Sequence, residues 1–412
     1  MKNNSLFCHR QSLARLSMVY IIIGLCFSCV LTACDAPAAN QNTTTTPSPS
    51  VSPTMAQLKT TPALTPTLAP MTPTPVTTMP PATGDMTFVY DDNTGYILLL
   101  CDRFYEGNST SQSETWTWDG KNWTQLHPVH APSIRSLVSI AYDPALKQVV
   151  LFGGLGKQGN DGMLADTWTW DGTDWTQQHP TTSPPARDDA ALAFDTATNQ
   201  LVLFGGGGNG PRIGGLVPPP LNNTWVWDGT NWIQQHPTTS PPTVLSPALA
   251  YDAARQKLML FGGTYADTTP VRKELNDTWE WTGTNWVQLH PQSSPSLFEN
   301  SNGQKILYSY PHMVYDPQSQ HIFLLFGGDD PNNNTGLQTS WEWDGANWTK
   351  TSVGGPPNGS DQGTLIYDAK MQAVLEVTVV EQPTSTSFDT TLWKWNEQSW
   401  RNIQEWGKAS QG

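Results

Sequence analysis

From residue 85 onward, the chain alternates short apolar runs with turn-forming residues, and no stretch shows the 3.6-residue spacing of an amphipathic helix. Two landmarks recur along it, each six times. The first is an aromatic residue followed by Asp. The second is Trp-x-Trp, a turn and a third Trp. Such recurrence predicts one supersecondary unit repeated in series rather than several independent domains. The aromatic-Asp pairs are Tyr90-Asp91, Tyr142-Asp143, Phe194-Asp195, Tyr251-Asp252, Tyr315-Asp316 and Tyr367-Asp368.

Each unit offers four short strand candidates, bounded by turn residues and rich in aromatic and β-branched side chains. The first candidate ends in the aromatic-Asp pair, the second in Gly-Gly, the third carries Trp-x-Trp, and the fourth begins with the third Trp. The Asp-Gly step in WDGTNW predicts a tight hairpin turn. Gly-Gly ends the second candidate at Gly154, Gly206, Gly263 and Gly328, whereas Cys101-Asp102 and Thr378-Val379 stand there in the first and last units. Six four-stranded units predict an all-β, six-bladed β-propeller over residues 85–406, followed by a tail over 407–412.

The FGG sequence followed by DTW-x-W and a further Trp resembles the kelch repeat of galactose oxidase-like propellers. This resemblance covers residues 85–406 and is strongest in the middle four units. The Asp-box of sialidase propellers has a residue between its Asp and Gly, whereas Asp171-Gly172 and Asp228-Gly229 are adjacent here. The resemblance therefore implies a kelch-type propeller with six blades.

The Trp triplets account for 18 of the 19 tryptophans. Because a binding site is asymmetric and need not be copied in every unit, this recurrence favours packing between neighbouring blades over ligand binding. The His-Pro pairs at His127, His179, His236 and His290 also recur at equivalent places. Ring symmetry would spread these histidines around the rim, too far apart to share a metal ion. The triplets are Trp116/Trp118/Trp123, Trp168/Trp170/Trp175, Trp225/Trp227/Trp232, Trp279/Trp281/Trp286, Trp341/Trp343/Trp348 and Trp393/Trp395/Trp400.

The N-terminal part of the chain has the pattern of a secretory leader. Residues 1–15 carry three cationic side chains, and an apolar stretch then ends in Leu-Thr-Ala before Cys34. This arrangement resembles a bacterial lipobox, which implies a signal peptide over residues 1–33, lipidation at Cys34, and a place in the bacterial cell envelope facing outside the cytoplasm. An uncleaved signal anchor is the alternative, since the apolar stretch is just long enough to span a bilayer. Residues 34–84 are rich in Thr and Pro and predict a disordered, extended stalk.

Charge and cysteine content narrow the function classes. The chain has 21 basic and 35 acidic side chains, and its repeats lack the clustered Lys and Arg that phosphate backbones require. We therefore expect no nucleic acid partner. Four of the five cysteines lie in the first 34 residues, which leaves Cys101 as a small apolar group within the repeats. We expect no cofactor, a monomer, and a protein or glycan as partner.

The predicted site lies on the face where the variable loops gather. Loops after the second and fourth strands of a blade emerge on one face, and the inserts after Gly206, Gly263 and Gly328 are long and variable. Variable loops on a rigid scaffold commonly carry function. The first strand of each blade adds polar side chains near this mouth of the central channel. The candidate ligand-binding residues are Arg135, Arg187, Asp188, Asp189, Tyr310 and His312.

These features predict a surface-anchored, non-catalytic module that recognises a protein or glycan through the long-loop face. The alternative is an extracellular carbohydrate-active enzyme at the channel mouth. Galactose oxidase holds copper with two Tyr and two His and has a Tyr–Cys cross-link, and His312 and Cys101 do not reproduce that set. The pairs Asp188/Asp189 and Asp329/Asp330 are sequence neighbours, which point apart on a strand and are rarely a catalytic pair. Asp329, Asp330 and the asparagines after them leave open either a Ca²⁺ site or a solvated turn.

Overall fold

The computed structural model describes residue 80 and residues 86–101, 113–156, 162–208, 220–265, 273–295, 298–301, 304–329, 336–356, 364–381 and 388–406. The chain divides into two units, residues 1–72 and 73–412, and only the second contains described residues. The predicted signal peptide, Cys34, almost all of the stalk and the tail at 407–412 lie outside the described residues. No helix among the described residues is long and apolar enough to cross a membrane.

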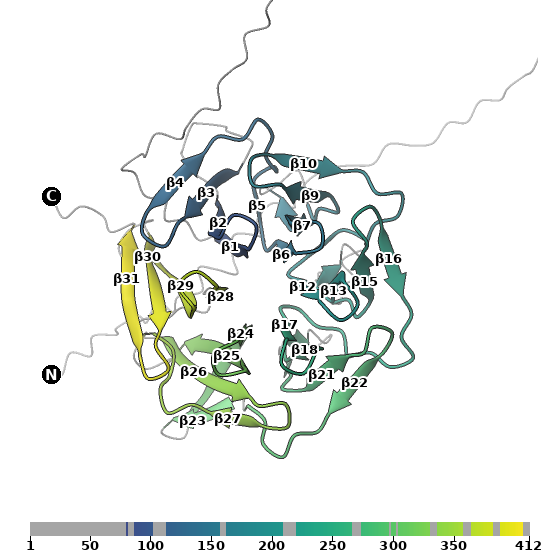
Figure 1. The fold of residues 1–412 in the computed structure, drawn as a ribbon. Coiled ribbons are helices and arrows are strands. Elements are labelled where there is room, and N and C mark those ends of the chain that lie inside the picture. Colours follow the sequence, from purple (N-terminus) through teal and green to yellow (C-terminus); the bar gives the residue numbers. More distant parts are fainter. Residues whose placement is uncertain are drawn as a thin grey trace, which may run out of the picture. The chain divides into compact units, whose positions relative to one another are not determined.

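Six antiparallel sheets are arranged radially around one axis, which confirms the predicted all-β, six-bladed propeller (Figure 1). Each blade uses one continuous stretch of chain. The first blade consists of β1 (Met86–Asp91), β2 (Tyr96–Cys101), β3 (Glu114–Trp118) and β4 (Trp123–Leu126). The second consists of β6 (Ser139–Asp143), β7 (Gln148–Phe152), β9 (Thr167–Trp170) and β10 (Trp175–Gln178). The third consists of β12 (Ala191–Asp195), β13 (Gln200–Phe204), β15 (Thr224–Trp227) and β16 (Trp232–Gln235).

The remaining blades follow the same order from the axis outward. The fourth consists of β17 (Ala248–Asp252), β18 (Lys257–Phe261), β21 (Thr278–Trp281) and β22 (Trp286–Leu289). The fifth consists of β24 (Gln304–Asp316), β25 (His321–Asp329), β26 (Gly336–Trp343) and β27 (Trp348–Lys350), with β23 (Phe298–Ser301) added beside β24. The sixth consists of β28 (Thr364–Asp368), β29 (Ala373–Glu381), β30 (Phe388–Trp395) and β31 (Trp400–Trp406).

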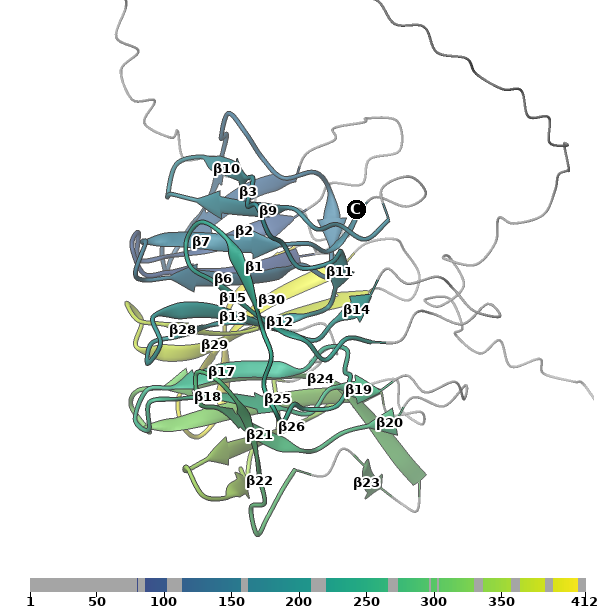
Figure 2. The same ribbon diagram turned by 90° about the vertical axis from the view of Figure 1, so that its right-hand side faces the viewer.

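Three small ribbons lie on the face opposite the first hairpin turns (Figure 2). They fix the segments that lead into and out of the long loops, and the sequence pattern did not predict them. The ribbons pair β5 (Arg135–Ser136) with β8 (Leu155–Gly156), β11 (Arg187–Asp188) with β14 (Gly207–Gly208), and β19 (Thr264–Tyr265) with β20 (Lys273–Glu274).

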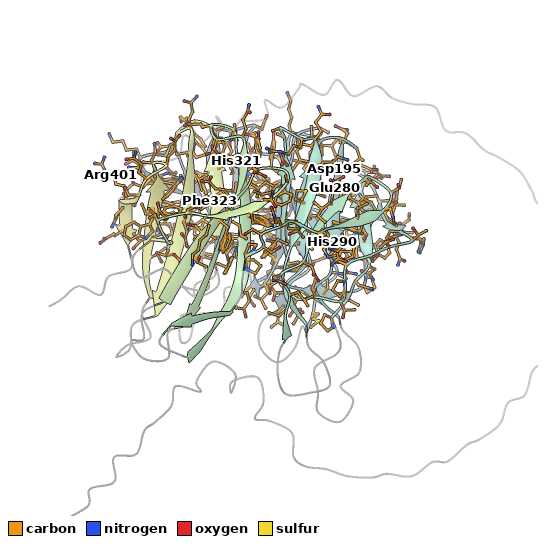
Figure 3. The ribbon with its side chains drawn as sticks, turned by 90° about the horizontal axis from the view of Figure 1, so that it is seen from below. Asp195, Glu280, His290, His321, Phe323 and Arg401 are labelled. Atoms are coloured by element: carbon orange, nitrogen blue, oxygen red, sulfur yellow. The ribbon has the colours of Figure 1, made fainter. Side chains whose placement is uncertain are left out.

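The aromatic-Asp landmark forms the first hairpin turn of each blade. In the second blade, the buried Asp143 carboxylate accepts the backbone N–H groups of Ala145 at 2.9 Å and Leu146 at 3.1 Å. An Asp side chain that bonds to backbone groups two and three residues later stabilises the turn locally. Asp195 has the same role in the third blade, and Figure 3 labels it at the end of the blades where these turns lie. The recurring Asp is therefore structural.

The hydrophobic core consists of clusters that each lie between two neighbouring blades. Between the first and second blades, Leu98 and Leu100 pack against Trp170 and Trp175. The ring centroids of those two tryptophans are 5.4 Å apart. The same arrangement closes the ring, where the tryptophans of the first blade pack against Leu375 and its neighbours in the sixth. Both indoles of Trp-x-Trp thus pack against a neighbouring blade, as the sequence predicts, and that neighbour is the preceding blade.

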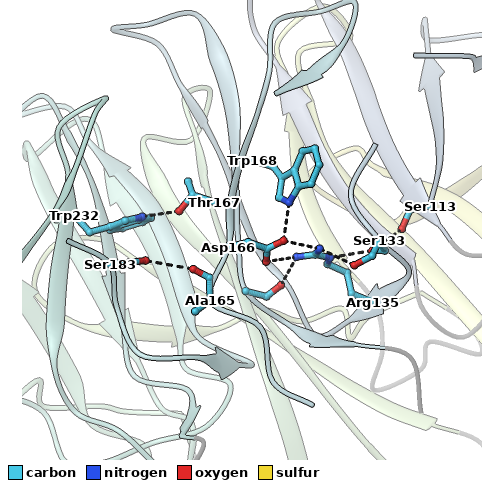
Figure 4. A network of polar contacts seen from close by, with 10 residues as sticks. Ser113, Ser133, Arg135, Ala165, Asp166, Thr167, Trp168, Ser183 and Trp232 are labelled. Atoms are coloured by element: carbon cyan, nitrogen blue, oxygen red, sulfur yellow. Dashed lines mark hydrogen bonds and ion pairs between the residues drawn. The ribbon is translucent and has the colours of Figure 1, made fainter. Parts of the chain in front are cut away.

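The third Trp of a blade also forms a hydrogen bond to the preceding blade. In Figure 4, Trp232 donates its indole N–H to Thr167 Oγ1 at 2.9 Å. The ring of Phe152 meets the same indole edge-on at 5.2 Å. At the closing junction, Leu392 takes the place of the threonine before Trp-x-Trp, and the contact there is apolar. The equivalent bonds join Trp175 to Thr115, Trp286 to Thr224 and Trp348 to Thr278.

The segment after each His-Pro pair connects one blade to the next. Thr181 donates its backbone N–H to Asn231 Oδ1 at 2.8 Å, and Trp232 donates its own to the carbonyl of Thr182 at 3.2 Å. The histidines themselves are exposed and belong to four different blades. Among the described residues, no group of three His, Cys, Asp or Glu side chains is placed to hold a metal ion.

The fifth blade differs from its prediction. Its Gly-Gly pair, Gly327 and Gly328, does not end the second strand, because β25 continues to Asp329 and pairs with residues of the expected loop. This blade has one more apolar residue before the pair, so Phe326 takes the register position that Gly153 has in the second blade. Phe326 stacks on Phe261 of the fourth blade with centroids 6.4 Å apart. The packing of Phe326 favours continuation of β25 beyond the point where the second strand of the second blade ends. The side chain of Asp329 and all of residue 330 lie beyond what the structure describes, so the Ca²⁺ alternative stays untested.

We predict that Thr224→Val destabilises the protein by about 1–3 kcal/mol, because it leaves the buried indole N–H of Trp286 without its acceptor while preserving shape. Equilibrium denaturation in urea would measure this change. Thr176→Val, on the exposed side of β10, is the matched control and should change the free energy of unfolding by less than 0.5 kcal/mol, a limit of about the size usual for surface substitutions. Equal effects of the two substitutions would contradict the role assigned to the inter-blade bond.

Candidate functional site

A central cavity of about 660 Å³ runs between the innermost strands of all six blades. Its wall consists mainly of the small and apolar side chains of β1, β6, β12, β17, β24 and β28. Polar groups gather at its two ends. The end near the first hairpin turns carries the aromatic residues Tyr90, Tyr142, Phe194, Tyr251, Tyr315 and Tyr367.

The tyrosines at the turn end are held by the preceding blade. The backbone N–H of Lys370 in the sixth blade donates to Tyr90 Oη at 3.2 Å. Burial, then the charges of Asp91 and Asp92, raises the pKa of Tyr142 to about 12. These phenols stay protonated at neutral pH and serve as contacts between blades, so this end of the cavity is structural.

At the other end, Leu137, Asp189 and Tyr310 line the cavity. Ser246 stands at the equivalent position of the fourth blade, and these four residues are here called the mouth ring. Each stands five residues before the aromatic-Asp pair of its blade. All four have left-handed backbone, with φ of 54°, 58°, 50° and 60°. Leu and Tyr rarely adopt this conformation, which costs of order 1–3 kcal/mol and is concentrated at functional sites.

Hydrogen bonds join members of the mouth ring across blade boundaries. Asp189 donates its backbone N–H to the carbonyl of Leu137 at 2.9 Å, and Ser246 donates its own to the carbonyl of Asp189 at 3.0 Å. Ser246 Oγ also donates to Asp189 Oδ2 at 2.5 Å. At these two junctions, the left-handed turn therefore allows one blade to bond to the next at this end of the cavity.

The mouth ring presents mixed chemistry. The side chain of Leu137 is exposed at 44%, which is unusual for a leucine, while Asp189, Ser246 and Tyr310 are half-buried. Leu137, Asp189 and Tyr310 offer an apolar group, a carboxylate and a phenol at this end of the cavity, and the Ser246 hydroxyl bonds to that carboxylate. Of the sequence-predicted residues, Asp189, Tyr310 and His312 line the cavity.

Asp188 lies beside the mouth, in the ribbon of β11 and β14. A Cβ atom on Gly207 would lie 2.2 Å from Asp188 Oδ1, so only glycine allows the carboxylate to approach the opposite strand so closely. Burial, then the charge of Asp189, raises the pKa of Asp188 to about 6. This acid is therefore partly protonated near neutral pH.

The two predicted arginines do not present their charge at the mouth. Arg135 is 5% exposed and forms a double hydrogen bond to the Asp166 carboxylate at 2.6 and 2.8 Å (Figure 4). Arg187 is 1% exposed and donates to the carbonyl of Gly205 at 3.0 Å. Both guanidinium groups hold the glycine turns that begin the long loops, and neither lines the cavity. The prediction that these two arginines lie at the mouth was wrong. Each guanidinium group is buried and donates its N–H groups to a backbone carbonyl of the nearby glycine turn.

His312 faces the junction between the fifth and sixth blades, where it pairs in register with Leu325. Its Nε2 atom is buried and has no hydrogen-bond partner among the described residues. Burial lowers the pKa of His312 to about 4, so the ring is neutral at neutral pH.

Glu376 is a buried acid that the sequence reasoning missed. It is 1% exposed on β29, and Gln338 of the fifth blade donates to its Oε1 at 2.7 Å. The equivalent register position is Leu151 in the second blade and Leu203 in the third. Burial raises the pKa of Glu376 to about 8, with the Gln338 bond opposing that rise. A comparison of the six units, position by position, would have found this substitution.

Comparison with known proteins supports the fold and goes no further. No family model matches the chain, and no curated relative does. Among solved structures, one described as YjhT superposes with a TM-score of 0.52 at 13% identity, covering 80% of this chain and 100% of that one. A fucose-specific lectin from Aleuria aurantia gives a TM-score of 0.47 at 12% identity, covering 80% and 97%. At these identities, the first likeness shows a shared propeller architecture, and nothing about function is taken from either.

We predict that Glu376→Leu stabilises the protein at pH 8 far more than at pH 4.5. The folded-state pKa of Glu376 lies above its unfolded value, so its favourable contribution is complete below about pH 4.5 and is lost as pH rises towards 8. The difference is up to about 4 kcal/mol. Denaturation midpoints between pH 4.5 and 8 would measure it. Glu397→Gln, at an exposed turn of the sixth blade, is the control and should keep the slope of the wild type. A slope that persists in Glu376→Leu would contradict this account.

Proposed function

We propose that this protein is a non-catalytic binding module that takes a neutral, hydroxyl-rich ligand, such as the end of a glycan, at the mouth ring. The observation that carries the proposal is the placement of Leu137, Asp189 and Tyr310 at one end of the cavity, with Ser246 Oγ bonded to the Asp189 carboxylate. Apolar surface with a few converging polar groups is the usual composition of a small-molecule site. Carboxylate and hydroxyl oxygens accept hydrogen bonds from sugar hydroxyls, and a phenol provides apolar surface together with a polar tip.

The electrostatics favour a neutral ligand over an anionic one. The chain carries a net charge of −14, and two carboxylates, Asp188 and Asp189, lie at or beside the mouth. The nearby arginines are buried in contacts with their own loops. An acidic polymer would therefore approach against the local charge.

In this proposal, the propeller is of the kelch type and is held outside the cell. The FGG and Trp-x-Trp pattern supports the first part, and the apolar leader before Cys34 supports the second. The Thr/Pro-rich stretch at 34–84 would act as the stalk that separates the binding face from the membrane.

Ligand binding is tested with a screen of immobilised neutral and acidic glycans, followed by calorimetry on the best binder. Asp189→Asn keeps a residue that tolerates left-handed backbone and should weaken binding at least tenfold, as should Tyr310→Ala. Thr349→Ala, on the exposed outer strand β27, is the control and should bind as the wild type does. Preference for acidic glycans, or full binding by both mouth variants with unchanged melting temperatures, would contradict the proposal.

A hydrolase is the second candidate. The pKa of Asp188 is raised, as a general acid requires, and Asp189 provides a second carboxylate next to it in the sequence. The two candidates differ in turnover. A binding module releases no reducing sugar from the glycans that it binds. Release by the wild type that disappears in Asp188→Asn would move the assignment to the enzyme.

Anchoring is tested with the full-length chain in a bacterial host. We expect Cys34 to incorporate a labelled fatty acid and the protein to fractionate with membranes, whereas Cys34→Ser loses the label. Cys101→Ser is the matched control, since Cys101 is buried in the first blade, and it should keep the label. Membrane association without any label would instead favour the uncleaved signal anchor.

A further inference from the structure

Arg135 and Arg187 occupy the same position in adjacent blades. Each stands seven residues before the aromatic-Asp pair, and each uses Nη1 to hold the glycine turn of its own blade. The bond runs to the carbonyl of Gly153 at 3.1 Å in the second blade and of Gly205 at 3.0 Å in the third. The backbone setting of the two guanidinium groups is therefore the same, and only their remaining partners differ.

In the second blade, the other guanidinium nitrogen is fully satisfied. Arg135 Nη2 donates to Ser133 Oγ at 2.9 Å and to Asp166 Oδ2 at 2.8 Å (Figure 4). The Asp166 carboxylate also neutralises the buried cation, since its other oxygen lies 2.6 Å from Nη1. The Asp166 carboxylate thus provides the Arg135 guanidinium with both a counter-charge and hydrogen-bond acceptors.

In the third blade, both acceptors of Nη2 are replaced. Pro185 stands at the position of Ser133 and has no hydroxyl. Asn223 stands at the position of Asp166, and its side-chain oxygen accepts from Arg187 Nη1 at 2.8 Å. Its other terminal group is a neutral amide NH₂, which cannot accept. Arg187 Nη2 is buried and has no hydrogen-bond partner among the described residues.

A buried cation without a counter-charge is costly, and buried charges in proteins are ordinarily paired. Arg187 is 1% exposed, so bulk water does not compensate for its charge. Asp188 does not supply the counter-charge, because its pKa is raised, whereas an adjacent guanidinium would lower it. The neighbouring loop at 209–219 contains no Asp or Glu in its sequence.

We propose that Arg187 Nη2 binds a small inorganic anion of the size of chloride, in the role that the Asp166 carboxylate has in the second blade. The site is internal to the third blade and stabilises the turn at Gly205 from which a long loop starts. It is independent of ligand binding at the mouth ring. The chain is acidic overall, so adventitious anion binding on its surface is disfavoured.

The test compares melting temperatures in sodium gluconate, sodium chloride and sodium acetate at equal ionic strength. The wild type should melt a few degrees higher in chloride than in gluconate, because an anion that binds only the folded state stabilises it by mass action. Asn223→Asp supplies the carboxylate covalently, so it should raise the melting temperature in gluconate and abolish the response to chloride. Asp166→Asn removes the counter-charge of Arg135 while Ser133 Oγ still accepts from Nη2, so it should give the second blade a smaller anion response of the same kind.

A structural measurement keeps the test decisive if Asp166→Asn fails to fold. Crystals grown in sodium bromide should show an anomalous peak beside Arg187 Nη2 in the wild type and none there in Asn223→Asp. An equal chloride response in the wild type and Asn223→Asp would overturn the proposal. So would stabilisation by acetate without chloride, or bromide peaks that mark an adventitious ion only, away from Arg187. Neither the melting temperatures nor the anomalous peaks depend on glycan binding at the mouth ring. The anion site and the proposed function can therefore be contradicted independently.

Discussion

The structure depends on contact between neighbouring sheets, because no strand is exchanged between the first and last blades. Each blade uses a continuous stretch of chain, so side-chain packing at the junctions carries ring closure. The tryptophans meet this requirement with large buried rings whose polar N–H group needs a partner. A threonine in the preceding blade supplies that partner at four junctions. The indole thus provides apolar burial and one directional bond that fixes how two sheets sit against each other.

The same repetition explains why a site forms at one end of the cavity. Every blade must bring its chain from the rim to the axis before its first strand, and the four blades whose entry residue the structure describes do so through a residue with left-handed backbone. At Asp189 and Ser246, this conformation allows a backbone bond to the neighbouring blade. Glycine would adopt it without strain, yet side chains are present at all four positions. Three of those side chains line the cavity at this end, so the architecture places chemical groups there at an energetic cost.

The sequence predicted the fold because periodic features report on contacts that are themselves periodic. The strand order, the number of blades and the orientation of Trp-x-Trp all followed from spacing. The location of Asp189, Tyr310 and His312 on the cavity wall could be approached in the same way, since the first strand of each blade lies at the axis. Arg135 and Arg187 could not, because a sequence does not show whether a guanidinium meets solvent or folds back onto its own glycine turn. The predicted strand end at Gly327 and Gly328 was wrong for a related reason. One extra apolar residue shifted the register, and Phe326 then allowed the strand to continue.

In a repeat protein, the individual features are found by comparing equivalent positions between blades. Glu376 replaces a leucine that the other five blades keep at the position of Leu151. Asn223 against Asp166 and Leu392 against Thr167 change the chemistry at positions that also vary in other blades. Each changes the balance of charge or hydrogen bonding at a buried place. Packing alone would favour copying the pattern unchanged, because every junction has the same shape to fill. The departures therefore mark the places where the symmetry of the ring is broken. Two of the three, Asn223 and Glu376, lie beside groups with unsatisfied polar atoms, which is where a ligand, an ion or a proton has the greatest energetic effect.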